Sequence, residues 1–359
     1  MQVVQVINSF ASATGGAEKL ALQFHQAYLK RGIDSHLVSL TDAVPNIPNT
    51  YAFGYSTPYH VAAVFRLYAL LKRRQWKHID VIHVHLFPAQ VFVPLAAKAA
   101  GIRARLVTTE HNTFSRRQRV IFGNTFDRLM YHFYCKIACI SSGTQDAMAQ
   151  WLPSTSRKLV TIYNGIDMSI FSVDAKRHRA ASQTPIILSA GRLTEQKNYK
   201  TAIEAISLLR DYDFEYWIAG QGELEGSLKQ LVRSLDLEDK VKFLGFRYDL
   251  PELFQQADIF LLVSRWEGFG LAVAEAMAAG LPVVASDVPG LREVVGEGSH
   301  AGFLVDPTAP ERVARGLRTL LEDRELRSTM SQNARRQASQ FAIEQTIEDY
   351  VQLYRSVLT

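Results

Sequence analysis

The stretch PIILSAGRLTEQKNYKTAIEAISLLRDYDFEYWIAG, residues 185–220, carries the pattern that decides the fold. Two short apolar runs, PIILSAG (185–191) and FEYWIAG (214–220), enclose a longer segment with helical patterning. A buried strand, a helix and a second buried strand in that order predict a βαβ unit with parallel strands. Helices cover both faces of such a sheet, which explains why the strands are apolar along their length.

The same alternation of strand and helix runs through the rest of the chain. After residue 220 the strand candidates are 241–245, 258–264, 281–286 and 301–305. In the first half they are 3–8, 36–40, 80–85, 105–109, 137–141 and 159–163. Between the first two of these, one helix face is indicated by the spacing of Leu20, Phe24, Ala27 and Tyr28. The chain is therefore predicted to contain two parallel sheets covered by helices.

A chain of 359 residues is longer than one hydrophobic core usually serves, so two domains are expected. We predict that both are doubly wound α/β domains of the Rossmann type, one at 1–165 and one at 166–342. The polar stretch 174–184 lacks periodicity and lies in or beside the linker. Residues 343–359 form a final amphipathic helix, which we expect to return to the N-terminal domain.

The composition is that of an ordinary globular protein. Hydrophobic residues make up 47% of the chain, which excludes a disordered or low-complexity architecture. Cys135 and Cys139 are too few for a disulfide framework and lack a CxxC pattern, so we expect small buried thiols. The best candidate for a membrane span, 268–285, is interrupted by Glu275 and by Pro282. Since no signal-peptide pattern opens the chain, we predict a cytoplasmic location.

The net charge of +5 conceals an uneven distribution. Residues 1–165 hold 18 Lys and Arg against 7 Asp and Glu, whereas residues 166–359 hold 22 against 28. This asymmetry indicates that the first half faces an anionic partner. A nucleic acid, a membrane surface and a phosphorylated substrate all fit the charge. No recognised nucleic-acid-binding module accompanies it, so a nucleic-acid partner is not expected.

The first motif, TGGAEKL (14–20), follows the first predicted strand. Gly15 and Gly16 allow a tight turn and a close approach of a ligand, and the helix that follows offers free N–H groups. A turn with a purely structural role is an equally good reading of two glycines. The motif lacks the GxGxxG spacing of dinucleotide-binding proteins, which disfavours a dehydrogenase.

The second motif, SAGRLTEQKNY (189–199), follows the first strand of the second half. Arg192 and Lys197 therefore lie at the carboxyl end of a strand, where open α/β sheets bind their ligands. A fork-shaped cation and a point charge five residues apart suit a diphosphate. Taken alone, the motif fits a solvated basic loop equally well.

The third motif, SRWEGFGLAVAEAMAAGLPVVASDVPG (264–290), combines a glycine-rich loop with two carboxylates. Gly268 and Gly270 precede a predicted helix, which is an arrangement that binds anions. Glu267 and Glu275 can accept hydrogen bonds from the hydroxyls of a sugar or a ribose. Eight helical residues span ~12 Å, against the ~5–5.5 Å between the carboxylates of a retaining glycosidase. We therefore interpret the two residues as gripping two ends of one extended ligand.

Together these motifs resemble glycosyltransferase family 4. The E-x7-E element at 267–275, GRLTEQKN, TIYNGID (161–167) and TGGAE occur in the order of that family along the whole chain. The resemblance implies the glycosyltransferase B fold, in which two Rossmann-like domains face each other across a cleft. It also implies transfer of a sugar with retention of configuration, without a metal or another cofactor.

The family pattern assigns roles to residues of the second half. Arg192 and Lys197 would hold the donor diphosphate and stabilise the leaving nucleotide. Glu267 would accept hydrogen bonds from the donor sugar, and Glu275 would bind the ribose hydroxyls. Backbone contacts to sugar and phosphate would come from Gly268, Phe269, Gly270 and Leu271.

In the first half the resemblance points to two residues. Gly16 would approach the diphosphate from the opposite domain. His111, in TEHNTF, matches a family histidine near the donor sugar on the acceptor side, and it follows a predicted strand. His83 and His85 lie two apart on one strand face, but no further ligand accompanies them at metal-binding spacing. We expect structural roles for that pair.

Basic and aromatic residues of the first half are grouped in two segments, RLYALLKRRQWKH (66–78) and SRRQRVIF (115–122). A single apolar stripe then follows, made of Phe126, Leu129, Met130, Phe133 and Tyr134. A core-facing helix is the simplest explanation for the stripe. The alternative is binding to an anionic membrane surface or to a lipid-linked diphosphate acceptor.

The leading hypothesis is a retaining glycosyltransferase. It would move a hexose or N-acetylhexosamine from a nucleotide sugar, a UDP-sugar, to a glycan or lipid-linked acceptor in cell-surface polysaccharide synthesis. Such an enzyme would be cytoplasmic or peripheral on the inner face of the membrane. Two alternatives remain: a nucleotide-sugar epimerase of related fold, and a non-catalytic subunit that binds a sugar nucleotide.

Overall fold

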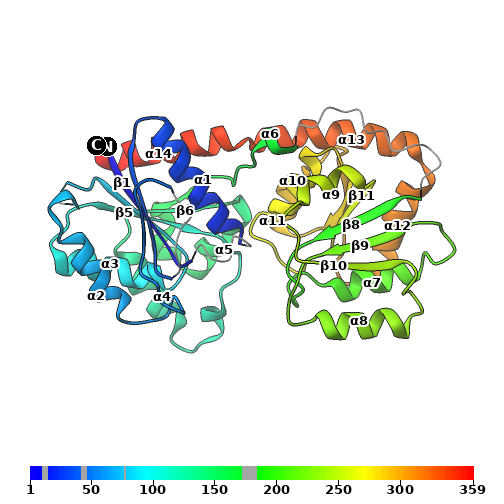
Figure 1. Cartoon of the computed structure of the whole chain (residues 1–359), viewed down its shortest axis with the longest axis horizontal. Helices are drawn as coiled ribbons and strands as arrows, with labels where there is room; N and C mark the ends of the chain where they lie inside the picture. Colours follow the sequence, from blue (N-terminus) through cyan, green and yellow to red (C-terminus); the bar gives the residue numbers. More distant parts are fainter. Residues whose placement is uncertain (10–14, 42–46, 77, 172–183) are drawn as a thin grey trace. The chain divides into compact units, whose positions relative to one another are not determined.

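The computed structural model describes residues 1–9, 15–41, 47–76, 78–171 and 184–359 (Figure 1). They form two compact units: unit 1 comprises Met1–Gly165 and Glu344–Thr359, and unit 2 comprises Ile166–Ile343. Each unit contains one parallel β-sheet with helices between its strands, so the predicted α/β class is confirmed. No helix in the described part of the chain is long and apolar enough to cross a membrane.

Unit 1 contains a seven-stranded sheet of order β3-β2-β1-β4-β5-β6-β7, in which all neighbouring strands pair in parallel. The strands are β1 (Gln2–Ile7), β2 (Asp34–Ser39), β3 (Thr50–Ala52), β4 (Val81–His85), β5 (Arg105–Glu110), β6 (Lys136–Cys139) and β7 (Leu159–Thr161). The α-helices are α1 (Gly16–Lys30), α2 (Ala63–Leu71), α3 (Ala89–Ala100), α4 (Gly123–His132), α5 (Ser142–Trp151) and α14 (Ile343–Leu358). Short 3₁₀ turns are η1 (Arg74–Trp76), η2 (Arg116–Arg119) and η3 (Pro153–Lys158).

The two faces of the unit 1 sheet differ in chemistry because side chains alternate along each strand. Ile82 and Val84 of β4 belong to a core of apolar side chains that includes α2, α3 and α4. On the opposite face, His83 hydrogen-bonds Tyr354 of α14. Figure 1 accordingly shows α14 beside α1 on one side of the sheet and α2, α3 and α4 on the other.

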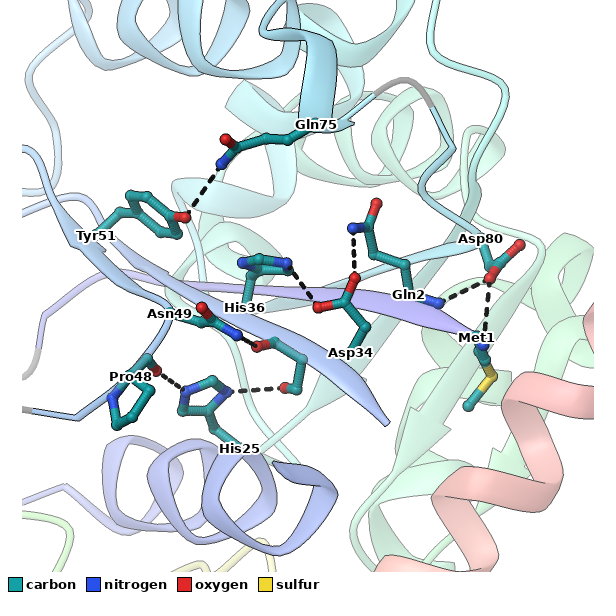
Figure 2. Close-up of polar contacts among 11 residues, drawn as sticks. Met1, Gln2, His25, Asp34, His36, Pro48, Asn49, Tyr51, Gln75 and Asp80 are labelled. Carbon is teal, nitrogen blue, oxygen red and sulfur yellow. Dashed lines mark hydrogen bonds and ion pairs between the residues drawn. The ribbon is translucent and has the colours of Figure 1, made fainter. Parts of the chain in front are cut away.

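The amino ends of three central strands are joined by polar contacts (Figure 2). The backbone N–H of Gln2 donates to Asp80 Oδ2 at 2.7 Å, and its side-chain amide donates to Asp34 Oδ2 at 2.7 Å. Asp34 also pairs with His36 Nε2 at 3.0 Å. These contacts hold the amino ends of β1, β2 and β4 together. Open α/β sheets bind their ligands beyond the opposite, carboxyl ends of the strands.

Unit 2 contains a six-stranded parallel sheet of order β10-β9-β8-β11-β12-β13. Its strands are β8 (Ile186–Ala190), β9 (Glu215–Ala219), β10 (Val241–Gly245), β11 (Ile259–Leu262), β12 (Val283–Ser286) and β13 (Gly302–Val305). Its helices are α6 (Met168–Phe171), α7 (Tyr199–Ser207), α8 (Glu225–Ser234), α9 (Leu250–Gln256), α10 (Leu271–Ala278), α11 (Pro289–Val295), α12 (Pro310–Glu322), α13 (Arg324–Ala338) and the 3₁₀ turn η4 (Ser339–Phe341). Buried apolar residues of β8, β9 and β11, among them Ile187, Tyr216 and Leu261, form its core.

Strand order reverses at β8 in unit 2 and at β1 in unit 1. Open α/β sheets bind ligands beyond the carboxyl ends of the strands at this reversal. In unit 2 the loops there follow β8 and β11, and in unit 1 they follow β1 and β4. Arg192, Lys197 and Glu267 lie in the loops of unit 2 and Gly16 follows the loop after β1, whereas His111 follows β5, the strand next to β4.

Candidate functional site

The loop after β8 carries Arg192 and Lys197 and is anchored by Asn198. Asn198 adopts a left-handed backbone conformation (φ 53°) at the start of α7, which asparagine tolerates better than most residues. Its buried side-chain amide donates to the carbonyls of Val263, at 3.2 Å, and Pro307, at 2.8 Å. Asn198 therefore ties this loop to the loop after β11.

Glycines allow the backbones to meet at this edge of the sheet. A Cβ atom on Gly220, just after β9, would lie 1.9 Å from the carbonyl oxygen of Gly191, just after β8. A Cβ atom on Gly222 would lie 2.3 Å from the carbonyl oxygen of Leu193. No other residue fits either position without moving the loop that bears Arg192.

Lys197 and Glu267, which come from separate motifs, form an ion pair. Lys197 Nζ lies 2.5 Å from Glu267 Oε1, and the Ser264 hydroxyl donates to the same oxygen at 2.8 Å. The backbone N–H of Arg265 donates to the carbonyl of Gln196 at 2.8 Å, which joins the two loops a second time. Because Glu267 is only 6% exposed, its carboxylate is held in one orientation by partners of its own unit.

The loop from Glu267 to α10 is buried, and its last position requires a glycine. Gly270 has φ 92°, and a side chain there would come within 2.2 Å of Leu291 Cδ2. The Phe269 ring packs edge-on against Phe341, with 5.2 Å between ring centroids. The residue before α10 is Gly270, which has no side chain with which to cap the helix, and the amino end of α10 faces this loop. An anion placed there would be stabilised by the helix dipole.

Gly290 supports the same loop from outside. A Cβ atom on this residue, in the first turn of α11, would lie 2.7 Å from the carbonyl oxygen of Glu267 and 2.8 Å from that of Gly268. The start of α11 therefore packs directly on the backbone of the candidate site. Gly290 closes the third motif, but spacing alone did not indicate its role.

The remaining predicted residues of unit 2 lie in the loop after β8 and in α10. Arg192 is exposed and makes no ion pair with any residue the structure describes. Leu271 begins α10, and Glu275 lies one turn further on and is 8% exposed. A free guanidinium, an ammonium group and an open helix terminus are the components that stabilise a departing diphosphate.

In unit 1, Gly16 begins α1, with Gly15 as the residue before the helix. Gly15 has an extended backbone (φ −95°, ψ 138°), so the expected tight glycine turn is not found at this residue. The side chain of Glu18 instead folds back over it, and a Cβ atom on Gly15 would meet Glu18 Oε2 at 1.9 Å. The residue before the helix, Gly15, has no side chain with which to cap it. Thr14 of the motif lies outside the described residues.

Three histidines form a row at the carboxyl edge of the unit 1 sheet. The rings of His83 and His85 on β4 are 4.0 Å apart, and His85 Nδ1 lies 3.4 Å from Nε2 of His111. His83 hydrogen-bonds Tyr354 at 2.6 Å and Thr109 at 2.7 Å. His83 is thus a buried framework residue, whereas His111 is at the partly exposed end of the row.

Burial keeps these histidines neutral. Desolvation lowers the pKa of His83 to about 3 and that of His111 to about 4, and it holds the pKa of His85 well below 6.5. A neutral imidazole at His111 can accept a hydrogen bond from a hydroxyl group. His85 Nε2 is buried without a hydrogen-bond partner among the described residues. Within that part of the chain, no group of three or more His, Cys, Asp and Glu residues is arranged to hold a metal ion.

A second polar cluster lies beside His111 and was not predicted. Glu110 Oε1 accepts hydrogen bonds from Tyr131 and from Gln90, both at 2.5 Å, and burial raises the pKa of this carboxyl group. Arg117 pairs with the buried Asp127 at 2.5 Å. Arg117 belongs to the basic segment 115–122, but Asp127 compensates its charge inside unit 1.

The apolar stripe predicted around α4 is divided between the core and the surface. Met130 and Tyr134 belong to the core, as expected. Phe126, Leu129 and Phe133 are exposed. The buried face of α4 carries Gly123, Asp127, Met130 and Tyr131, so Phe126 and Leu129 lie outside it. Phe133 and Tyr134 follow the end of α4 at His132, so the helical spacing does not govern them.

Two family models match the chain in succession. One, described as Glycosyltransferase Family 4, matches residues 14–170, and the other, described as Glycosyl transferases group 1, matches residues 171–337. Among curated proteins, N-acetyl-alpha-D-glucosaminyl L-malate synthase of Bacillus anthracis is 26% identical, over 96% of this chain and 95% of its own length.

A further relative is N-acetylgalactosamine-N,N'-diacetylbacillosaminyl-diphospho-undecaprenol 4-alpha-N-acetylgalactosaminyltransferase of Campylobacter jejuni. It is 31% identical, over 70% of this chain and 69% of its own length. Among solved structures, HepE of Anabaena in complex with UDP and glucose matches with a TM-score of 0.85, over 99% of this chain and 100% of its own, at 23% identity. That likeness shows a shared fold.

Proposed function

This chain belongs to glycosyltransferase family 4 and has the glycosyltransferase B fold, and on that premise we propose the reaction it performs. It is a glycosyltransferase. We propose that it transfers a hexose or N-acetylhexosamine from a UDP-sugar to a glycan or lipid-linked acceptor in cell-surface polysaccharide synthesis. The names of relatives support this choice, because one is a transferase acting on a diphospho-undecaprenol glycan and another was crystallised with UDP and glucose.

The observation that carries the proposal is the Lys197–Glu267 pair at the carboxyl ends of β8 and β11. We assign Lys197 and Arg192 to the donor diphosphate, where they stabilise the charge that develops on the leaving nucleotide. Glu267 accepts hydrogen bonds from the donor sugar, and its orientation is already set by Lys197 and Ser264. Glu275 is assigned to the ribose hydroxyls. The backbone at the start of α10 is assigned to sugar and phosphate, through Gly268, Phe269, Gly270 and Leu271.

For unit 1 we keep His111 and Gly16 as proposed site residues. His111 follows β5, and Gly16 begins the helix after β1, so both belong to the carboxyl edge of that sheet. His111 would accept a hydrogen bond on the acceptor side. We assign Gly16, the first residue of α1, to the diphosphate.

We propose retention of configuration by attack from the face that the leaving group occupies. Glu267 Oε1 is engaged by an ammonium group and a hydroxyl group, which makes this carboxylate a poor nucleophile. The acceptor oxygen then bonds to the anomeric carbon as the bond to the diphosphate breaks, and a diphosphate oxygen takes the acceptor proton. Arg192 and Lys197 would supply the positive charge, so we expect activity after chelator treatment. Proton NMR of the product would show an inverted anomeric centre if this proposal is wrong.

The location is also a proposal. Both cysteines are free thiols, as is usual in a reducing compartment, which supports a cytoplasmic enzyme. A lipid-linked acceptor would place it at the inner face of the membrane, as a peripheral protein with an anionic surface as a further partner. No nucleic-acid partner is proposed.

The test is transfer from UDP-, GDP- and ADP-sugars to a polyprenyl-diphosphate-linked acceptor by variants Lys197→Ala and Glu267→Ala. We expect the rate of transfer to fall about 10²–10³-fold in each, as when one preorganised charge-stabilising group is removed. Lys200→Ala serves as the matched control, because Lys200 is exposed and pairs with Glu204 one turn away, on the outer face of α7. Wild-type transfer by both site variants would exclude the assignment.

The alternatives from sequence predict different products. An epimerase would convert the nucleotide sugar without an acceptor, whereas a transferase releases UDP when the acceptor is added. A non-catalytic subunit would bind the donor without turnover. The relatives compared above are named as a synthase and a transferase, so neither alternative is favoured.

A further inference from the structure

More than half of the exposed large hydrophobic side chains in the described chain belong to two short segments of unit 1. The first segment, residues 59–68, contributes Tyr59, Val61, Phe65 and Tyr68. The second, residues 120–133, contributes Val120, Ile121, Phe122, Phe126, Leu129 and Phe133. Single exposed apolar residues are normal in a globular protein, but a continuous group of this size marks a place of contact.

The two segments meet at Phe87. The Tyr59 ring lies 6.1 Å from the ring of Phe87, which in turn lies 6.1 Å from the ring of Phe126. The two segments therefore adjoin at Phe87, on the side of the sheet covered by α2, α3 and α4 (Figure 1). We call their exposed apolar side chains the apolar face. Its most exposed members, Ile121 at 92% and Phe122 at 76%, stand between η2 and α4.

The surroundings of the apolar face carry positive charge almost without compensation. Residues 54–79 contain no acidic residue, and residues 111–145 contain only Asp127, which is buried and paired with Arg117. Exposed cations on and beside the two segments are Arg66, Lys72, Arg73, Arg74, Arg119 and Arg128. Apolar side chains ringed by cations are the combination that binds the interface of an anionic membrane.

We propose that the apolar face docks on an anionic lipid bilayer, with Ile121 and Phe122 entering the headgroup layer and the surrounding cations contacting lipid phosphates. A second copy of the chain is a poorer occupant. A symmetric dimer would bring identical basic surfaces together, and these repel each other. A negatively charged bilayer supplies the complementary charge along the whole face.

The docking surface continues to the proposed acceptor side. Tyr131 of α4 donates to Glu110, and Glu110 immediately precedes His111. The helix that bears Phe126 and Leu129 on its exposed face therefore holds the residue next to His111 with its buried face. The purpose of docking, which is to bring a lipid-linked acceptor to unit 1, rests on the proposed function. Vesicle binding itself needs neither donor nor acceptor.

The experiment is cosedimentation of the full chain with vesicles of phosphatidylcholine, with and without phosphatidylglycerol. We expect binding to the anionic vesicles that weakens as salt is added. Ile121→Ser/Phe122→Ser should lower the affinity about ten-fold or more, because two apolar side chains no longer enter the interface. The matched control is Leu208→Ser/Tyr248→Ser, which changes two exposed apolar side chains of unit 2 and should bind like the wild type.

Each outcome decides the proposal. It is overturned if the wild type fails to bind anionic vesicles at low salt, or if the Ile121/Phe122 variant binds them as tightly as the wild type does. It is also overturned if light scattering shows a dimer that the Ile121/Phe122 variant abolishes, without vesicle binding. That variant should keep wild-type transfer to a short soluble acceptor. If the wild type binds anionic vesicles but transfers no sugar to any acceptor, the proposed function is contradicted and the docking proposal stands.

Discussion

The ionisable side chains at the carboxyl edges of the two sheets differ in charge state: unit 2 has a charged pair, and unit 1 has neutral histidines. In unit 2, Lys197 and Glu267 form an ion pair that is fixed by neighbouring loops. In unit 1, His83 and His85 are fully buried, and their pKa values are lowered, chiefly because burial removes the water that would solvate a charged imidazole. In unit 2, an anionic group of a ligand can replace the Glu267 carboxylate as the partner of Lys197. The histidines of unit 1 form a neutral framework that resists protonation.

The difference matches the proposed division of work. A site that releases a diphosphate benefits from positive charge that is in place before the reaction starts. Such charge stabilises the leaving group without any reorganisation during the reaction. A site that receives a hydroxyl group needs a neutral hydrogen-bond acceptor near neutral pH, and His111 provides one because burial lowers its pKa to about 4.

The largest expected effect is the response of unit 1 to acid. The pKa of His83 falls from 6.5 to about 3 on folding, and that of His111 to about 4. Below pH 6.5 the unfolded chain binds more protons at these histidines than the folded chain does. The free energy of unfolding of unit 1 therefore decreases as the pH falls from 6.5 toward 4 and then 3. Each histidine contributes about 1.4 kcal/mol per unit of pKa difference. Pulse-labelling hydrogen exchange in urea, from pH 7.5 to 4, should show β4 opening before β8.

A matched pair of variants sharpens that measurement. His83→Asn removes one buried imidazole and should flatten the loss of β4 protection with falling pH. His300→Gln changes an exposed histidine of unit 2 and should leave it unchanged. If β4 and β8 lose protection at the same pH in the wild type, the two edges do not differ as described.

The second effect concerns packing in unit 2. Gly290→Ala places a methyl group 2.7 Å from the Glu267 carbonyl oxygen, so the loop with Glu267 and Gly268 must shift. We expect transfer to fall about 100-fold, since a displacement of 1 Å can have that effect. Gly226→Ala is the control, because a methyl group there meets nothing within 4 Å and favours helix α8. Equal activity of the two variants would show that the loop tolerates displacement.

The same contrast explains what could be predicted from sequence. Lys197 and Glu267 lie in short motifs after strands, and parallel strands bring their carboxyl ends to one edge, so the sequence could predict that both residues lie at that edge of the unit 2 sheet. Their direct contact could not, because motif spacing does not say which side chains pair. Gly290 was also missed, since its role depends on the packing of α11 against a loop more than twenty residues earlier.

Unit 1 was harder to predict because its framework joins distant segments. His83 hydrogen-bonds Tyr354, 271 residues away in sequence, and Thr109 hydrogen-bonds Tyr350, 241 residues away. The final helix was recognised from its periodicity, but that pattern does not show that its tyrosines reach a strand histidine. The apolar stripe of α4 showed the same limit, because composition alone does not separate core residues from exposed ones such as Leu129.

The smallest expected effect is the coupling free energy within the Lys197–Glu267 pair. A double-mutant cycle of Lys197→Ala and Glu267→Ala on the unfolding of unit 2 should give ~1–3 kcal/mol, since both side chains are largely buried. The exposed pair Lys229–Glu225 of α8 is the control, with ~0.3–0.5 kcal/mol expected for an i,i+4 pair. Urea unfolding monitored by exchange in β8 measures both. Equal coupling in the two pairs would mean that solvent screens the site pair as it screens the surface. The contrast between a charge-paired edge in unit 2 and a neutral edge in unit 1 would then rest on unit 1 alone.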